Sequence, residues 1–214
     1  MTLMLSADEL LTTTRSVRKR LDPDKPVPRE VLVECLELAV QAPSGSNLQG
    51  WQWMFVEDTA KKKALADIYR AAFDNYLQLP RLEFEQGDNR GDRMDRIVDS
   101  STYLADHFHE VPVIMVPCIQ GRVETAPEMG ASFWGSLLPA VWSYQLALRS
   151  RGLGSAYTTM HLFGDGERQA AEVLGIPFAE YSQAGMFPIA YTTGTEFRPA
   201  KRLPFEQIMH WDQW

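Results

Sequence analysis

Two basic runs and one amide-rich loop are the segments of this chain whose residue types could do chemistry. The basic runs lie near opposite ends of the sequence, at Arg15-Ser16-Val17-Arg18-Lys19-Arg20 and at Arg198-Pro199-Ala200-Lys201-Arg202. The loop between them reads Ala42-Pro43-Ser44-Gly45-Ser46-Asn47-Leu48-Gln49-Gly50-Trp51. Guanidinium groups suit phosphate oxygens, and amide groups offer both donors and acceptors to a ring. We therefore expect a large anionic ligand that carries a hydrogen-bonding ring system.

Flavin mononucleotide (FMN) has both of these features. Asn47 and Gln49, with the backbone around 44–46, can supply the donors and acceptors that its ring needs, and Gly45 allows a close backbone approach. Taken alone, the loop is more typical of a plain helix-to-strand turn, and the basic runs are more typical of two solvated charge clusters. A shared ligand also requires that the two ends of the chain meet in the fold.

Composition limits the classes of function. The 214 residues are 45% apolar and 23% charged, which predicts one globular domain over residues 1–214. The net charge of −7 argues against a nucleic-acid partner. Cys35 and Cys118 fall in apolar patterns and are interpreted as buried thiols, without a disulfide. The sequence shows no signal peptide and no apolar run of membrane-spanning length, so we expect a cytoplasmic protein without a membrane partner.

The order of helical and strand-like patterns predicts an α+β layered fold rather than a regular βαβ repeat. The predicted helices are 6–14, 28–42, 58–78, 93–109, 133–148 and 167–174. The predicted strands are 51–56, 111–119, 155–160 and 184–193, the last interrupted by Pro188. Nine of the sixteen residues in 81–96 are charged, so we expect this stretch to be a mobile cover over the site.

The helix at 133–148 is apolar nearly all round. Phe133, Trp134, Leu138 and Trp142 are distributed over its faces. We expect it to be buried on most sides, and such a helix in a modest domain is a good candidate for a subunit interface.

These motifs resemble those of the FMN-dependent nitroreductase family, in order and spacing over nearly the whole chain. Residues 13–19 look like that family's Arg-Ser-x-Arg motif, and residues 42–51 like its Ala-Pro-Ser-x-x-Asn-x-Gln-x-Trp loop. Residues 152–156 look like its Gly-Leu-Gly strand entry beside the flavin. The chain departs from the pattern where it has Thr14 before Arg15 and where it reads Ala190-Tyr191-Thr192 in place of Gly-Tyr-Pro.

The resemblance implies a central mixed or antiparallel sheet flanked by helices, in an intertwined homodimer with FMN at the interface. The loop and the N-terminal cluster would reach each flavin from different subunits, and 158–160 would lie beside its N5. The expected cofactor-binding residues are Arg15, Ser16, Val17, Arg18, Pro43, Ser44, Gly45, Ser46, Asn47, Gln49, Thr158, Thr159, Met160, Arg198, Lys201 and Arg202.

The expected activity is an oxidoreductase with a ping-pong mechanism, in which NADH or NADPH reduces FMN and a nitroaromatic, a quinone or a related small molecule then accepts the electrons. No side chain is expected to be catalytic, because FMN carries the chemistry. The alternatives are an FMN store or sensor, a flavin-destructase or dehalogenase on the same scaffold, and a flavin-free interaction module.

Other signatures fail. Gly152-x-Gly154 follows a helix and lacks a third glycine, so a Rossmann site is rejected. His107 and His109 do not share a helix face, and we expect no metal. His161 is interpreted as structural more readily than as a contact to substrate.

Overall fold

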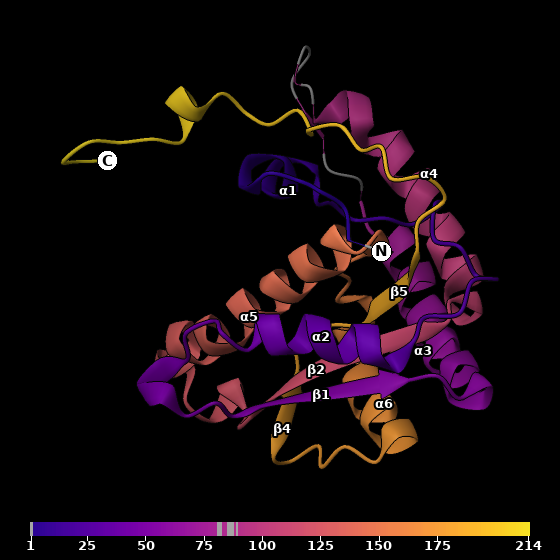
Figure 1. Cartoon of the computed structure of the whole chain (residues 1–214). Coiled ribbons are helices and arrows are strands. Elements are labelled where there is room, and N and C mark those ends of the chain that lie inside the picture. Colours follow the sequence, from indigo (N-terminus) through magenta and orange to yellow (C-terminus); the bar gives the residue numbers. More distant parts are fainter. Residues whose placement is uncertain (1, 81–82, 85–87, 89) are drawn as a thin grey trace.

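The computed structural model describes residues 2–80, 83–84, 88 and 90–214. An antiparallel sheet lies at its centre, with helices on both faces (Figure 1). The helices are α1 (Ala7–Thr13), α2 (Arg29–Ala39), α3 (Thr59–Leu77), α4 (Gly91–His107), α5 (Gly130–Ser150) and α6 (Gly166–Leu174). The strands are β1 (Trp51–Val56), β2 (Val113–Gln120), β3 (Leu153–Ser155), β4 (Tyr181–Gln183) and β5 (Phe187–Tyr191).

The strand order is β1-β2-β5-β3, and β4 also pairs with β2. Each of these named pairs is antiparallel, and a single isolated bridge between Ser16 and Ser155 runs parallel. The predicted α+β fold with an antiparallel sheet is therefore confirmed.

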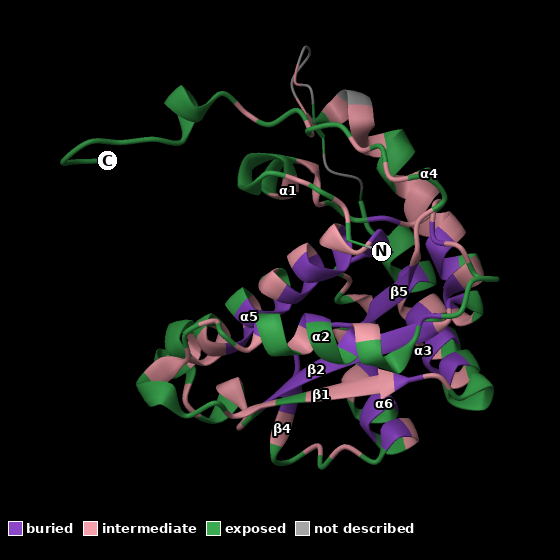
Figure 2. Cartoon of the chain, in the orientation of Figure 1, coloured by how far each residue is buried: buried purple, intermediate pink, exposed green. Residues whose placement is uncertain are grey.

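The sheet has an apolar layer on each face because the side chains of β2 alternate between them. Val113, Met115 and Ile119 pack with α2 and α5, whereas Ile114 and Val116 pack with α3, α4 and α6. Figure 2 shows β2 buried and the helix faces that turn outward exposed. Cys35 and Cys118 are free and buried, as predicted, and they lie in opposite layers. Burial raises the pKa of their thiols to about 11 and about 12.

Local signals place most helix ends correctly. Ser6 caps α1 in a capping box with Glu9, and the Asp58 carboxylate accepts a hydrogen bond from the Lys61 amide at the start of α3. Gly175 ends α6 in the left-handed conformation that helix C-termini favour.

Two strand predictions are wrong in their bounds. The strand predicted at 155–160 ends at Ser155, and residues 160–162 form a 3-10 turn instead. The strand predicted at 184–193 is confined to β5 at Phe187–Tyr191, because the chain first passes close to Thr158 at Met186, and β4 lies before the predicted range. Pro188 lies inside β5 and does not end it.

The helix predicted at 133–148 is α5, but within one chain it is not buried on most sides. One face packs on the sheet and α2, and the other exposes Gly135, Pro139 and Trp142 to solvent. No second apolar layer of the same chain covers that face among the described residues.

The predicted cover at 81–96 lies in part outside the described residues. From Gly91 onward it is the start of α4. Among the described residues, no helix is long and apolar enough to cross a membrane.

Candidate functional site

The N-terminal and C-terminal basic runs meet in the fold, as a shared ligand requires. The Arg15 guanidinium donates from Nη1 to the carbonyl oxygen of Arg198 at 2.6 Å. The Val17 amide donates to the Ser155 carbonyl at 2.8 Å, which fixes the N-terminal basic run to the edge of β3. The sheet edge thus positions basic residues that are 183 positions apart in sequence.

Arg20 has a structural role in this meeting. Its guanidinium donates to three carbonyl oxygens, those of Thr193, Gly194 and Glu196, at 3.0, 2.8 and 2.9 Å. The same group stacks on the Phe197 ring at 4.3 Å. Arg20 therefore shapes the C-terminal turn, and its donors are used within the protein.

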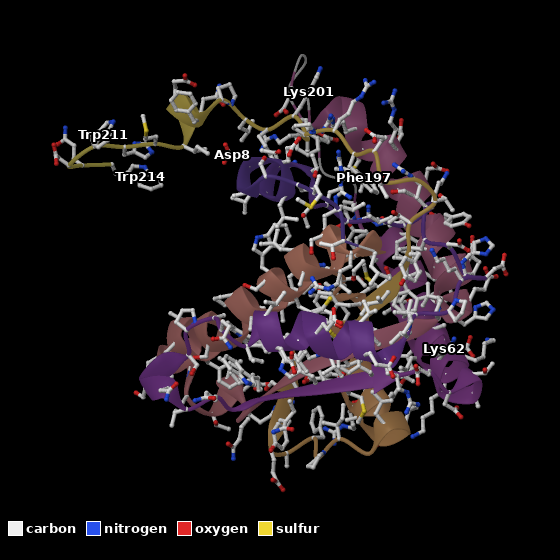
Figure 3. The ribbon with its side chains drawn as sticks, in the orientation of Figure 1. Asp8, Lys62, Phe197, Lys201, Trp211 and Trp214 are labelled. Atoms are coloured by element: carbon white, nitrogen blue, oxygen red, sulfur yellow. The ribbon has the colours of Figure 1, made fainter. Side chains whose placement is uncertain are left out.

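Phe197 also contacts a second guanidinium. Arg149, at the end of α5, lies 4.8 Å from the ring and donates to the Thr195 carbonyl at 3.0 Å. Figure 3 shows Phe197 at the crossing of the N-terminal and C-terminal segments. Cation–π contacts with two arginines anchor this end of the chain before it leaves the body of the protein.

A cavity of about 440 Å³ opens beside this crossing. Five basic side chains line it together with polar neighbours. The lining residues are Arg15, Ser16, Val17, Arg18, Lys19, Arg20, Ser100, Glu196, Phe197 and Arg198. With one carboxylate against several cations, the lining carries a net positive charge that suits an anionic ligand.

Arg18 also lines a second cavity, of about 210 Å³, between α3, α4 and the 157–160 segment. Its Nη1 lies 3.4 Å from the Ser100 hydroxyl, and no carboxylate of the described residues forms an ion pair with it. Burial lowers the pKa of Arg18, because its charge has lost water without gaining a counterion. An anion or a polar ring edge at this junction would restore that lost solvation.

The second cavity has the composition of a site for a flat ring. Its walls are mainly aromatic and apolar, with three threonine or serine hydroxyls. The lining residues are Arg18, Tyr69, Phe73, Tyr76, Leu77, Met94, Ile97, Val98, Ser101, Tyr157, Thr158, Thr159 and Met160. Tyr157 stacks on Phe187 at 4.8 Å, which holds its ring in place.

A tight crossing of two segments positions Thr158 to Met160 beside this cavity. The Met186 amide donates to the Thr158 carbonyl at 2.8 Å. A Cβ at Gly185 would lie 2.8 Å from that carbonyl oxygen, so glycine is required for the approach. The 3-10 turn at Met160–Leu162 then follows directly.

Gly154 serves close packing. A Cβ there would lie 2.6 Å from Thr192 Cγ2 and 3.0 Å from Val17 Cγ2. Gly152 has φ +75° at the turn out of α5. The Gly-Leu-Gly motif therefore brings the basic run and β3 into contact.

The amide-rich loop is strained and exposed. Ser46, Asn47 and Gln49 have φ of 51°, 55° and 49°, in the left-handed region that L-residues rarely adopt. Gly45 donates to the Ser136 hydroxyl at 2.8 Å, and the Gln49 side-chain amide donates to Asn47 Oδ1 at 2.9 Å. Strain of this kind clusters at binding sites.

The loop and the basic cluster lie at opposite ends of α5 (Figure 1). The loop docks at Ser136, and Arg149 at the other end contacts Thr13. At 1.5 Å per residue, these two positions are about 20 Å apart along the helix. Within one chain, the loop does not line either of the two cavities.

The structure thus separates the predicted site residues into three groups. The basic cluster, Arg198 and 158–160 are near one another, and the loop with Pro43 and Ser44 is remote from them. Lys201 and Arg202 lie farther along the C-terminal segment and outside the lining of both cavities (Figure 3).

Sequence reasoning missed the walls contributed by α3 and α4. Tyr69, Phe73 and Tyr76 recur at helical spacing, which is the only signal they give. Core residues of an amphipathic helix give the same signal, so the sequence could not distinguish the two roles.

His161 is fully buried, so it does not contact a substrate from this position. Burial, opposed only by its hydrogen bond to Gln183, lowers its pKa to about 4. The imidazole is neutral in the folded protein at neutral pH.

A stability difference with pH follows from His161. Between about pH 6.5 and pH 4 the unfolded chain binds a proton at His161 that the folded chain does not, so stability falls as the pH falls through this window. The contribution is about 3 kcal/mol. Urea unfolding at pH 7.5 and 4.5 should show a larger loss for the wild type than for His161→Met, and equal losses would contradict the assignment.

The chain is similar to known proteins over most of its length. The sequence pattern of the Nitroreductase family matches residues 11–191. An NADH dehydrogenase of Thermus thermophilus is 27% identical, with 97% of each chain covered. An iodotyrosine deiodinase of Thermotoga neapolitana is also 27% identical, over 85% of this chain and 86% of that one.

The fold is that of a solved FMN and NADPH-dependent nitroreductase from Sphigopyxis sp. strain HMH. The two superpose with a TM-score of 0.71 at 21% identity, covering 98% of this chain and all of that chain. The family match spans most of the sequence and includes both the basic cluster and the amide-rich loop. The chain therefore belongs to the nitroreductase family of flavin oxidoreductases.

Proposed function

We propose that the domain formed by residues 1–214 binds FMN, with its phosphate in the basic cavity and its ring in the aromatic cavity. Arg18 carries this proposal, because it lines both cavities and is desolvated without a counterion. Arg15 and Arg198 supply further positive charge on the phosphate side. The donor set therefore fits a ligand with an anionic end and a flat apolar ring.

Each wall has a task in the reaction. The guanidinium groups neutralise the phosphate and hold the ring in register, and the aromatic walls exclude water from the reacting face. The 158–160 segment lines the aromatic cavity, and its backbone would donate a hydrogen bond to the N5 edge of a bound flavin. When bound, FMN would accept electrons from NADH or NADPH and deliver them to a second small molecule in ping-pong order.

The acceptor in this proposal is a nitroaromatic, a quinone or a similar flat molecule. Apart from Arg18, no lining residue of the aromatic cavity is charged within the described part of the chain. Such walls favour planar acceptors over highly charged ones.

The complete site requires a homodimer in this proposal. One chain holds the loop and the basic cluster about 20 Å apart along α5, so a second copy must bring its loop to the first copy's cavities. The exposed face of α5 that carries Trp142 gives an apolar surface for such an interface.

The C-terminal segment supports the same conclusion. Beyond Lys201, whose carbonyl accepts a hydrogen bond from Arg93 of α4 at 3.5 Å, it leaves the body of the protein and projects into solvent (Figure 1). It carries exposed Phe205 and Ile208, and Trp211 and Trp214 are 76% and 100% exposed. A segment this apolar needs a partner surface, and a second copy supplies one.

Subunit complementation tests the shared site. Arg18→Ala removes one guanidinium group of the basic cluster. Gly45→Val displaces the loop, because a Cβ at position 45 would lie 2.7 Å from the Ser132 hydroxyl. Each homodimer should bind FMN poorly. Heterodimers formed by refolding the two variants together should regain one tight site per dimer, because one site then has both wild-type elements.

If each chain builds its site alone, the mixture stays as weak as its components. Mixing either variant with itself is the matched control. Recovery in the heterodimer only would assign the loop and the cluster to different subunits.

A dehalogenase is the second candidate, because one relative is an iodotyrosine deiodinase. Incubating the reduced protein with 3-iodotyrosine and measuring released iodide separates the two. The proposal predicts faster turnover of a nitroaromatic or a quinone than of iodotyrosine, and the reverse order would favour the dehalogenase.

A further inference from the structure

His161 is joined to β4 and α6 by a buried polar chain behind the ring cavity. Its Nε2 lies 3.1 Å from Gln183 Oε1. The Gln183 side-chain amide donates to the Glu167 carbonyl at 2.8 Å, which leaves Oε1 to face the imidazole. Oε1 can only accept, so His161 is protonated on Nε2 and neutral.

The far end of the chain is anchored. The Gln183 backbone amide donates to Glu167 Oε1 at 2.9 Å. Arg122 donates to both carboxylate oxygens of Glu167 at 2.9 Å and stacks on the Phe178 ring at 4.2 Å. A paired carboxylate with this many partners holds Gln183, and through it His161, in one orientation.

Stability alone does not explain a histidine at this position. The second ring nitrogen, Nδ1, is buried and has no hydrogen-bond partner among the described residues. An unpaired buried acceptor costs desolvation free energy that an apolar side chain of similar size would not. Packing therefore does not account for a histidine, rather than an apolar residue, at position 161.

The position of His161 supplies a reason for the histidine. It follows Met160 directly and forms the middle of the 3-10 turn at Met160–Leu162. Its carbonyl is covered by Gly166, where a Cβ would lie only 2.2 Å from the oxygen. The side chain fixed by Gln183 and the carbonyl fixed by α6 together hold the turn that ends the 158–160 segment.

We propose that His161 is a positioning residue, which through Gln183 holds the backbone of 158–160 in the orientation that the flavin ring requires. The effect on the flavin rests on the proposed function, whereas the positioning of the 158–160 backbone by His161 does not. Loss of the His161–Gln183 bond should loosen the segment locally and change how the protein discriminates oxidised from reduced flavin.

The first experiment uses the protein without flavin. Amide hydrogen exchange of peptides covering 157–162 is compared in wild type, His161→Met and Gln183→Met, the last removing the bond from the other side. The expected result is about tenfold faster exchange of 157–162 in both variants, in excess of any change in peptides from the rest of the protein. His161→Gln, which can still donate to Gln183, should restore slow exchange.

Leu174→Ala is the matched control, since it weakens the same packing layer without touching this chain of bonds. It should lower the unfolding temperature without selectively loosening 157–162. Equal exchange in wild type and both Met variants would overturn the proposal, and so would a loosening that Leu174→Ala reproduces.

The second experiment measures the midpoint potential of bound FMN and the rate constant for its reduction by NADPH. His161→Met should lower the potential and slow the reduction about tenfold, without a change in the NADPH concentration at half saturation. An unchanged potential overturns the redox half of the proposal. If wild type binds no FMN, the exchange result still decides the positioning role, so the two proposals fail separately.

Discussion

Replacing Arg18 with alanine should weaken FMN binding about thirtyfold, because it removes charge-assisted hydrogen bonds at the junction of the two cavities. Isothermal titration of the apoprotein with FMN measures the change. Riboflavin, which lacks the phosphate, should bind more weakly than FMN to wild type. The ratio of FMN affinity to riboflavin affinity should be smaller in Arg18→Ala than in wild type.

Lys201→Ala is the control for nonspecific loss of positive charge. Lys201 lies outside the lining of both cavities, so its replacement should change FMN affinity less than threefold. Equal losses for the two variants would show that net charge, rather than the cavity, attracts the ligand. Both titrations use the same ionic strength, because salt screens the attraction between the ligand and basic side chains.

Deleting residues 203–214 should convert a dimer into a monomer and lower FMN affinity more than a hundredfold. None of the deleted residues lines either cavity, so the loss would arise from the missing partner subunit. Sedimentation velocity reports the mass, and titration reports the affinity. The double change Trp211→Ala and Trp214→Ala should weaken the dimer in the same direction.

The control for the tail is Glu206→Gln, which changes an exposed charge and keeps the apolar side chains. It should leave both mass and affinity unchanged. A truncated protein that stays dimeric and binds FMN tightly would remove the tail from the proposed interface.

Much of the fold could be predicted from local signals. The capping residues Ser6 and Asp58 mark helix starts, and the alternation of β2 marks a strand with two buried faces. These signals work because each depends on residues that are close in sequence. The meeting of Arg15 and Arg198 needed the motif order of a whole family, because no local pattern encodes a contact across 183 positions.

The errors in the prediction also have physical causes. The strand predicted at 155–160 ends early because Gly185 lets another segment cross at Thr158, a tertiary contact that strand propensity does not register. The exposed face of α5 looked buried because an apolar helix surface gives the same pattern in a core and at an interface. The bond between His161 and Gln183 is likewise tertiary and gives no sequence signal.

The absorbance spectrum of the purified protein, saturated with FMN and then mixed anaerobically with NADPH or NADH, decides whether the chain is a nicotinamide-dependent flavin enzyme. We predict a yellow protein whose flavin absorbance bleaches within seconds and returns when a quinone or nitroaromatic is added. A yellow protein that only dithionite can bleach would contradict the nicotinamide-dependent activity and favour a flavin store. A protein that stays colourless after gel filtration from excess FMN would contradict the flavin site itself.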